Sequence, residues 1–226
     1  SVFKQAIKWG KASSNPCRDV ERNPECARAN DVSDVELALF IDAATPMLRA
    51  YIELKYLTGL RKGDMLSLTR QQLLDEGIYV QPRKNLRRHP KTGEIVRTKE
   101  RIIEWTPELR AAIDAALSLP RRTGSMFVFS QRNGQGYYDA DAARSRAFDF
   151  QWSRTIRRAA QLATERGIVF RAFREHDVRA KSGKDAQESS GDGARLLGNT
   201  PGQFERAYHG GIEKVTPLKR NRGAGK

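Results

Sequence analysis

Cysteine and histidine are scarce in this chain of 226 residues, which has two cysteines and three histidines. Cys17 and Cys26 are too few for a disulfide framework, and this scarcity fits a reducing cytoplasm. Neither cysteine stands at a metal-ligand spacing from His89, His176 or His209. We therefore expect no structural metal.

Long apolar runs are also missing. The longest candidate, residues 35–44, is interrupted by Glu36 and Asp42 and is far shorter than the roughly 20 residues of a membrane-spanning helix. The first residues lack the apolar core of a secretory signal. We therefore expect neither a membrane span nor secretion.

Positive charge, by contrast, is abundant. The chain has 41 Lys and Arg residues against 27 Asp and Glu residues, and its formal net charge is +14. A globular protein this basic needs an anionic partner, with nucleic acid as the first candidate and an acidic membrane surface as the second. The hydrophobic content of 38% is sufficient for one packed core of about 150–200 residues.

The hydrophobic pattern divides the chain into an appendage and one packed domain. Residues 2–10 have the composition of one short helix, which is too short and apolar to be stable alone. Residues 13–30 are rich in Ser, Asn, Pro and charge, which is typical of a linker. We expect the packed domain to begin near Asp31.

Helix boundaries in this domain carry clear local signals. Ser33 and Glu36 form the pattern of a capping box before an apolar run. Thr45 followed by Pro46 is typical of a second helix start, and Gly59 is suited to end that helix. Residues 141–166 have the pattern of a long helix.

Strand signals are few. Residues 78–80 and 102–105 are rich in β-branched and aromatic side chains and are expected to pair. A very basic stretch, residues 83–99, lies between them, and residues 127–129 have the composition of another short strand. The fold class is therefore expected to be mainly α (α+β), a helical domain with one small antiparallel sheet.

A first candidate site lies where Gly59 ends one helix and Arg61 opens the next. A guanidinium there can face an oxyanion beside exposed backbone N–H groups. Taken alone, this segment is more often a helix–helix corner with a surface arginine.

Two further segments carry reactive side chains. His176 and Arg179 are three residues apart, so on a helix they share one face. They offer proton transfer near neutral pH and a bidentate positive charge. Tyr208 follows Asn199 by nine residues. A tyrosine is a poor nucleophile at its ordinary pKa of about 10, but cationic surroundings help it to lose its proton. Taken alone, each of these two segments more often has a structural role.

Together and in this order, the three segments resemble the tyrosine recombinase family, to which phage integrases belong. The matching motifs are Gly-Leu-Arg-x-x-Asp at 59–64, His-x-x-Arg at 176–179 and Leu-Leu-Gly-Asn…Tyr at 196–208. Residues 104–109 and the Asn-Pro-Cys at 15–17 are also similar to phage-type integrases. The resemblance covers nearly the whole chain.

The resemblance implies the roles of the site residues. Tyr208 would attack a DNA phosphate and form a 3′-phosphotyrosyl link, with no cofactor. Arg61 and Arg179, together with His176 and Asn199, would stabilise the developing charge, and His176 would accept the tyrosine proton.

The family also uses a lysine on a β-hairpin as general acid. The resemblance implies Lys84 for this role, with Lys91 and Lys99 as alternatives because the hairpin is longer than usual. Asn199 departs from the family pattern, which usually has histidine there. Its amide can donate a hydrogen bond to a phosphate oxygen but carries no charge and shuttles no proton.

The resemblance further implies the domains and partners. Residues 1–30 would be the last helix of a truncated core-binding domain plus a linker, and residues 31–226 the catalytic domain with a mobile C-terminal tail. The full-length protein would act as a homotetramer on double-stranded DNA attachment sites in a bacterial host, integrating or excising phage or prophage DNA. A host DNA-bending protein is a candidate partner, and the fragment alone is expected to be monomeric and to bind DNA weakly. The candidate DNA contacts are Arg83, Arg87, Arg88, Lys91, Lys99, Arg154, Arg157 and Arg158.

Three alternatives remain at this point. A type IB topoisomerase-like enzyme would share the chemistry but relax supercoils. A DNA-binding protein with vestigial motifs, such as the product of a decayed prophage, is favoured only by Asn199. A helical regulator that does not bind DNA is disfavoured by the net charge of +14.

Overall fold

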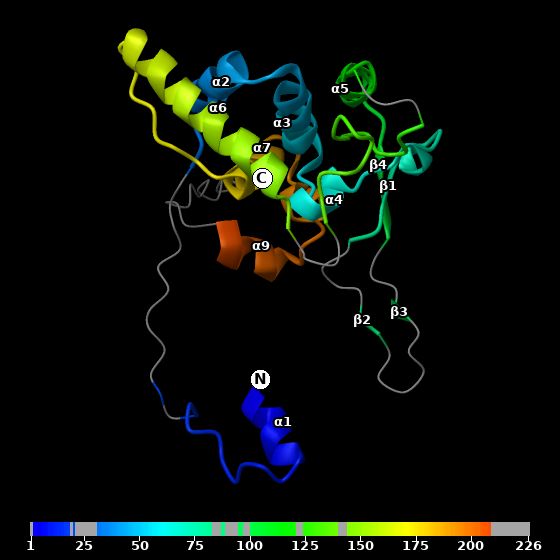
Figure 1. Cartoon of the computed structure of the whole chain (residues 1–226), viewed down its shortest axis with the longest axis vertical. Helices are drawn as coiled ribbons and strands as arrows, with labels where there is room; N and C mark the ends of the chain where they lie inside the picture. The colour runs from blue at the N-terminus through cyan, green and yellow to red at the C-terminus, as the bar shows by residue number, and fades with distance from the viewer. Residues whose placement is uncertain are drawn as a thin grey trace, which may run out of the picture.

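The computed structural model describes residues 2–18, 20, 31–82, 87–88, 95–96, 100–120, 124–139 and 144–208. At 87–88, 95–96 and 205–208 it describes the backbone only. The described part is mostly helical and contains short antiparallel strand pairs, which confirms the expected fold class (Figure 1).

The described helices follow the chain in a simple order. They are α1 (Val2–Lys8), α2 (Asp34–Ala43), α3 (Pro46–Thr58), α4 (Lys62–Leu66), the 3-10 helix η1 (Arg70–Gln72), α5 (Pro107–Leu117), α6 (Arg146–Glu165), α7 (Glu175–Ser190), α8 (Gly193–Leu197) and α9 (Pro201–Tyr208).

The helix starts expected in the first half of the packed domain are confirmed. Ser33 and Glu36 form a reciprocal capping box at the start of α2. Thr45 caps α3 through a hydrogen bond from the backbone N–H of Leu48, and Gly59 ends α3 in the left-handed conformation with φ of 57°. Local chemistry therefore determines both ends of the helix that leads into Arg61.

The expected pairing of two strands is also confirmed. Strand β1 (Gly77–Val80) pairs antiparallel with β4 (Arg101–Glu104), so that Ile78 lies opposite Ile103. Further out on the same connection, β2 (Arg87–Arg88) pairs with β3 (Ile95–Val96). Figure 1 shows these two pairs in line, with β2 and β3 projecting away from the helices.

Helix α3 lies at the centre of the described fold, in contact with α2, α5 and α7, while α2 also packs against α6. An aromatic cluster fills the space between these helices. The ring of Phe40 lies 4.4 Å from that of Trp152, and the ring of Tyr51 lies 4.5 Å from that of Phe148. In Figure 1, α2 and α6 lie on one side of α3, and α5 with the β1–β4 pair lies on the other.

Two sequence predictions were wrong in detail. Residues 127–129 do not form a strand of a sheet but make only one bridge, from Phe127 to Thr69. The pairing stops there because the partner segment turns into η1 at Arg70. The long helix begins at Arg146 rather than at residue 141, because Arg144 exchanges backbone hydrogen bonds with Asp139 in a β-bridge and so is not part of the helix.

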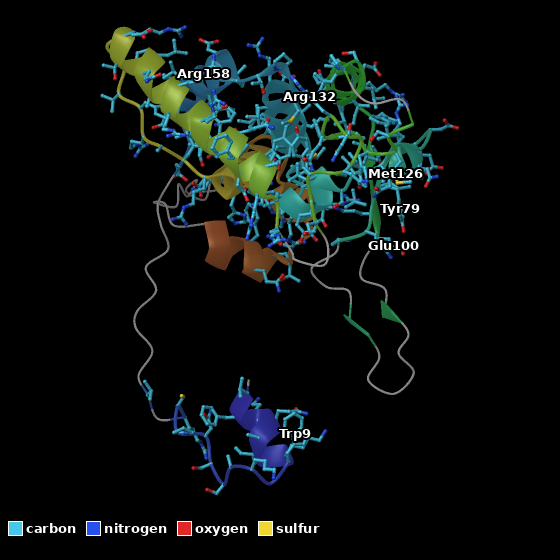
Figure 2. The ribbon with its side chains drawn as sticks, viewed as in Figure 1. Trp9, Tyr79, Glu100, Met126, Arg132 and Arg158 are labelled. Atoms are coloured by element: carbon cyan, nitrogen blue, oxygen red, sulfur yellow. The ribbon has the colours of Figure 1, made fainter. Side chains whose placement is uncertain are left out.

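Helix α1 has no buried residue, and Trp9, just beyond it, is 68% exposed. Figure 2 shows Trp9 and α1 well apart from the other helices. Among the residues that the structure describes, no helix combines the length and the apolar character needed to cross a bilayer.

Candidate active site

The site begins at the corner between α3 and α4. Gly59 packs directly against α8, since a Cβ atom on it would lie 2.4 Å from Cδ2 of Leu197. Leu60 is buried, and Arg61 occupies the N-cap position of α4. A left-handed glycine and a buried leucine therefore fix the backbone immediately before Arg61.

Arg179 connects this corner to a second turn. The residue lies on α7 and is only 2% exposed. Its Nη1 donates to the carbonyl of Gly59, and its Nη2 donates to the carbonyl of Leu197 at 2.7 Å. One guanidinium thus joins the turn before Arg61 to the turn before Asn199, which lie far apart in the sequence.

The turn before Asn199 is the carbonyl end of α8. The helix ends at Gly198, which is left-handed with φ of 63°. Arg101 of β4 donates from Nη1 to the carbonyls of Arg195, at 3.1 Å, and Leu196, at 2.5 Å. The C-terminal end of a helix carries partial negative charge and favours cations. Arg101 and Arg179 therefore hold this end from two different elements.

Helix α9 follows directly and carries Tyr208 as its last residue. The helix packs through the buried Phe204 against Gly183 of α7 and Gly193 of α8. A Cβ atom on either glycine would lie 3.0 or 2.9 Å from the Phe204 ring. The two glycines allow this close approach, which places the end of α9 one helical turn beyond Phe204.

Two cavities meet at Arg61. The larger one, of about 1010 Å³, is also lined by His176 and Arg157. The smaller one, of about 420 Å³, is also lined by Arg101 and Asn199. The Arg61 guanidinium is not hydrogen-bonded to any residue that the structure describes, so it is available to a ligand in either cavity.

The site is strongly cationic. Burial, followed by the positive charges of Arg179 and Arg61, lowers the pKa of Arg101 to about 10. Three guanidinium groups that repel one another in this way are suited to an anion with several oxygens, such as a phosphodiester.

His176 lies on the wall of the larger cavity, where its side chain is exposed at the start of α7. Partial desolvation of the imidazole, followed by the positive charge of Lys55, lowers the pKa of His176 below 6.5. The neutral imidazole, which can accept a proton, is therefore favoured at pH 7.

The structure thus brings together four of the predicted catalytic residues: Arg61, His176, Arg179 and Asn199. The backbone of Tyr208 is placed at the end of α9, and its side chain lies outside the described residues, as does all of Lys84. The catalytic roles of all six residues stay predictions.

The structure likewise describes the side chains of only some of the predicted DNA contacts. Arg154, Arg157 and Arg158 are exposed on α6, and Arg157 lines the larger cavity. Figure 2 shows Tyr79 and Glu100 at the β1–β4 pair and Arg158 on the opposite side of the helical body. Of the remaining predicted contacts, Arg87 and Arg88 are described by their backbone only, in β2, and Arg83, Lys91 and Lys99 lie outside the described residues.

Arg101 and Lys55 were not predicted from the sequence, although each left a signal. Side chains along β4 point alternately to its two faces. Arg101 therefore shares the partly buried face with Ile103, whereas Ile102 lies on the exposed face. Lys55 follows Tyr51 by one helical turn on the buried face of α3. A cation on an inward face was the signal in both cases, because such a group needs an internal partner.

Comparisons with known proteins agree with this architecture. The chain is similar to a lambda integrase dimer bound to a COC′ core site, with 17% identity and a TM-score of 0.61 over 95% of this chain and 72% of that one. It is similar to the Tn1549 transposon integrase in complex with circular intermediate DNA, with 16% identity and a TM-score of 0.62 over 91% of this chain and 70% of that one. It is also similar to XerA recombinase, with 17% identity and a TM-score of 0.59 over 84% of this chain and 63% of that one.

The chain spans 58% of the length of the lambda integrase in its Holliday-junction complex. No protein-family model and no curated protein matches the chain. All three solved structures are tyrosine recombinases, and the small sheet beside a helical body is common to them and to this chain. The chain therefore has the fold of the tyrosine recombinase catalytic domain.

Proposed function

We propose that the chain is the catalytic part of a site-specific DNA recombinase, which cleaves and rejoins DNA through a 3′-phosphotyrosyl intermediate. The observation that carries this proposal is the Arg179 guanidinium, which joins the turns before Arg61 and Asn199 and gathers three separated motifs around one cationic site. A phosphodiester is the DNA group that such a site recognises.

In this reaction the hydroxyl oxygen of Tyr208 forms a bond to the scissile phosphorus, while the bond from phosphorus to the 5′ oxygen breaks. The tyrosine proton passes to His176, whose lowered pKa keeps it able to accept one. Lys84 donates a proton to the departing 5′ oxygen. The 5′ hydroxyl of a partner strand then reverses these steps, so that the phosphodiester energy is conserved.

The arginines supply the electrostatic part of the reaction. Arg61, unbonded to described residues, binds the phosphoryl oxygens directly, while Arg179 adds charge from its fixed position. Removal of one such donor lowers the reaction rate by roughly 10²–10³-fold. The amide of Asn199 adds a neutral hydrogen bond in place of a charged one.

The nucleophile is tested by covalent trapping. A library of nicked duplexes with random sequence around the nick is incubated with the chain, and DNA that stays bound to denatured protein is sequenced. We expect the parent chain and a control Tyr137→Phe to yield adducts, and Tyr208→Phe to yield none while still binding DNA. An adduct on Tyr208→Phe would remove Tyr208 as the nucleophile.

The general acid is tested with a 5′-bridging phosphorothiolate, in which sulfur leaves without a proton. This substrate is expected to restore cleavage by Lys84→Ala. If Lys84→Ala is not rescued and Lys91→Ala or Lys99→Ala is, the general acid is that residue instead.

DNA binding itself is expected to depend on phosphate contacts and to weaken steeply as salt rises. The candidates on α6 are Arg154, Arg157 and Arg158, and the remaining candidates belong to the basic stretch of residues 83–99. We further propose that residues 1–30 end a core-binding domain and that the whole protein works as a tetramer at phage attachment sites, with a host DNA-bending protein as a candidate partner. The fragment alone is expected to bind weakly.

A second candidate function is DNA binding without cleavage, which Asn199 favours because it removes a charged group from the site. Adduct formation by the parent chain would exclude it. Relaxation of supercoiled plasmid without recombination would instead indicate the topoisomerase-like alternative.

A further inference from the structure

We propose that Lys55 is a positioning residue, which joins the backbone before Arg61 to the side chain before His176 and so holds the two groups at their working separation. This inference rests on the proposed function, because it assigns Lys55 a part in that reaction.

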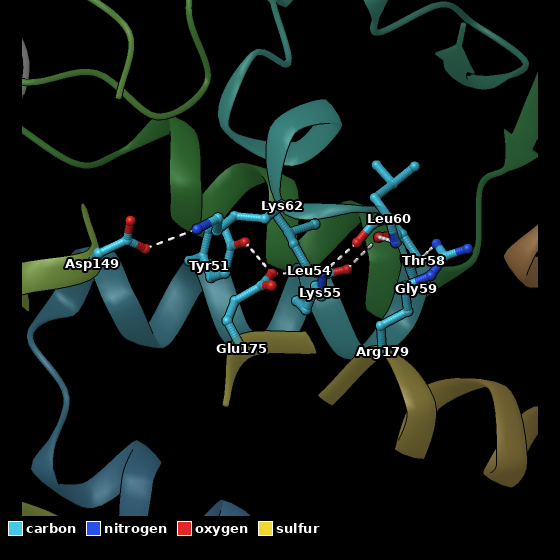
Figure 3. Close-up of polar contacts among 10 residues, drawn as sticks. All are labelled: Tyr51, Leu54, Lys55, Thr58, Gly59, Leu60, Lys62, Asp149, Glu175 and Arg179. Atoms are coloured by element: carbon cyan, nitrogen blue, oxygen red, sulfur yellow. Dashed lines mark hydrogen bonds and ion pairs between the residues drawn. The ribbon is translucent and has the colours of Figure 1, made fainter. Parts of the chain in front are cut away.

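The geometry of Lys55 carries the proposal. Its side chain is fully buried in α3. The ammonium lies 2.6 Å from Oε1 of Glu175 and donates to the carbonyl of Leu60 at 2.5 Å. Leu60 directly precedes Arg61, and Glu175 directly precedes His176. Figure 3 shows this chain of contacts running from α7 through α3 to the corner before α4.

Glu175 is fixed from a second side. The hydroxyl of Tyr51, one turn before Lys55 on α3, donates to Oε1 of Glu175 at 2.6 Å. The carboxylate therefore cannot shift along α3 without losing a hydrogen bond or the ion pair. Because Glu175 begins α7, this contact sets the depth at which the first turn of α7, and with it His176, enters the site.

Two buried cations hold the corner before α4 through the carbonyls of consecutive residues. Arg179 binds the carbonyl of Gly59, and Lys55 binds the carbonyl of Leu60. The two cations leave the backbone before Arg61 little freedom, while the Arg61 side chain stays available to the cavities.

Stability alone does not account for a buried ion pair here. Transfer of both charges out of water is costly, and apolar residues of similar volume often serve the fold as well or better. Such a pair is most useful where a defined separation matters, which is the case between two catalytic segments. Lys55 cannot itself reach DNA, because its side chain is fully buried.

The pair also acts on His176 through charge. After desolvation, the charge of Lys55 is the largest influence lowering the pKa of His176, while the Glu175 carboxylate raises it. Arg179 lowers it and Asp177 raises it to a smaller extent. The other charged groups on the same cavity are Arg61, Lys62, Asp149, Arg157 and Arg174. Since the two partners act with opposite sign, removal of either one moves the His176 pKa in a direction that can be stated in advance.

The test uses the double variant Lys55→Met/Glu175→Gln, which removes both charges and leaves neither unpaired. The matched control is Lys181→Met/Asp34→Asn, which removes another lysine–carboxylate pair between α7 and a neighbouring helix, with its nitrogen and oxygen 2.7 Å apart. Each protein is assayed for single-turnover adduct formation on trapped duplexes and for DNA affinity.

We expect the first double variant to bind DNA like the parent but to form adducts about 10²-fold more slowly, as a small misplacement of reacting groups does. The control is expected to stay within about threefold of the parent. Equal rates for the parent and the first double variant would overturn the proposal. If that variant does not fold, Tyr51→Phe decides: several-fold slower adduct formation supports the proposal, and an unchanged rate contradicts it.

A second readout does not depend on cleavage. Titration of the His176 ring by NMR in the free chain is expected to show a lower pKa in Glu175→Gln than in the parent. An unchanged His176 pKa would contradict the electrostatic part. If the parent forms no adduct although the His176 pKa moves as expected, the proposed function fails and the local arrangement stands.

Discussion

Replacement of Arg179 by lysine tests whether this arginine holds the fold together as well as serving the reaction. Arg179 is 2% exposed, and its two nitrogens bind the carbonyls of Gly59 and Leu197. A lysine keeps the charge, but its single ammonium cannot span both carbonyls. One buried carbonyl is then left without a donor, which costs about 1–3 kcal/mol.

For a domain of this size, each kcal/mol lowers the midpoint of thermal unfolding by about 2–4 °C. The product of the two ranges predicts that Arg179→Lys unfolds about 2–12 °C below the parent. The measurement is thermal unfolding followed by circular dichroism, with a second probe to check that the transition is two-state.

Arg61→Lys is the matched control, because Arg61 also lies in the site but is not hydrogen-bonded to any described residue. Its unfolding midpoint is expected within about 1 °C of the parent, although both variants should lose adduct formation by roughly 10²-fold or more. Equal midpoints for the two variants would refute the view that Arg179 ties the two turns together.

Three further predictions concern single features of the fold. Gly59→Ala should destabilise the chain by about 2 kcal/mol or more in urea unfolding, because φ is 57° and the new Cβ would lie 2.4 Å from the Leu197 side chain; an unchanged midpoint would contradict the close packing of α3 on α8. Arg101→Met should slow adduct formation about tenfold or more with a smaller loss of DNA affinity, since it frees the carbonyl end of α8 and removes one of the three charges around the site; a loss of affinity as large as the loss of rate would indicate that Arg101 acts through a direct phosphate contact instead. Burial raises the pKa of Glu36, but hydrogen bonds from Ser33 and Arg171 outweigh it and place the pKa below 4.5. Its contribution to stability should therefore be full above pH 4.5 and be lost as pH falls below it, and Glu36→Gln should remove that part of the acid unfolding.

The sequence was sufficient wherever a feature depends on neighbouring residues. The capping box of Ser33 and Glu36, the proline start at Pro46 and the left-handed end at Gly59 all involve contacts within a few residues. The pairing of β1 and β4 followed from the β-branched and aromatic composition of the two segments. Where local signals compete with distant partners, as at residues 127–129, the sequence prediction was wrong.

The order and spacing of the motifs also indicated which residues to consider in the site, and four of them meet in the structure. Their meeting is a tertiary fact. Arg179 reaches a carbonyl 120 residues away, and Arg101 reaches one 94 residues away. No periodicity or spacing in a single sequence encodes such contacts, because they depend on how whole helices pack.

The sequence by itself therefore determined several helix ends and the main strand pair, since these follow from local hydrogen bonding and hydrophobic pattern, and its motifs supplied the candidates for the reactive side chains. Only the tertiary structure decided that Arg101 and Lys55 belong with them. Both are cations placed on inward faces, and such groups acquire a role only when folding brings carbonyls or a carboxylate to them.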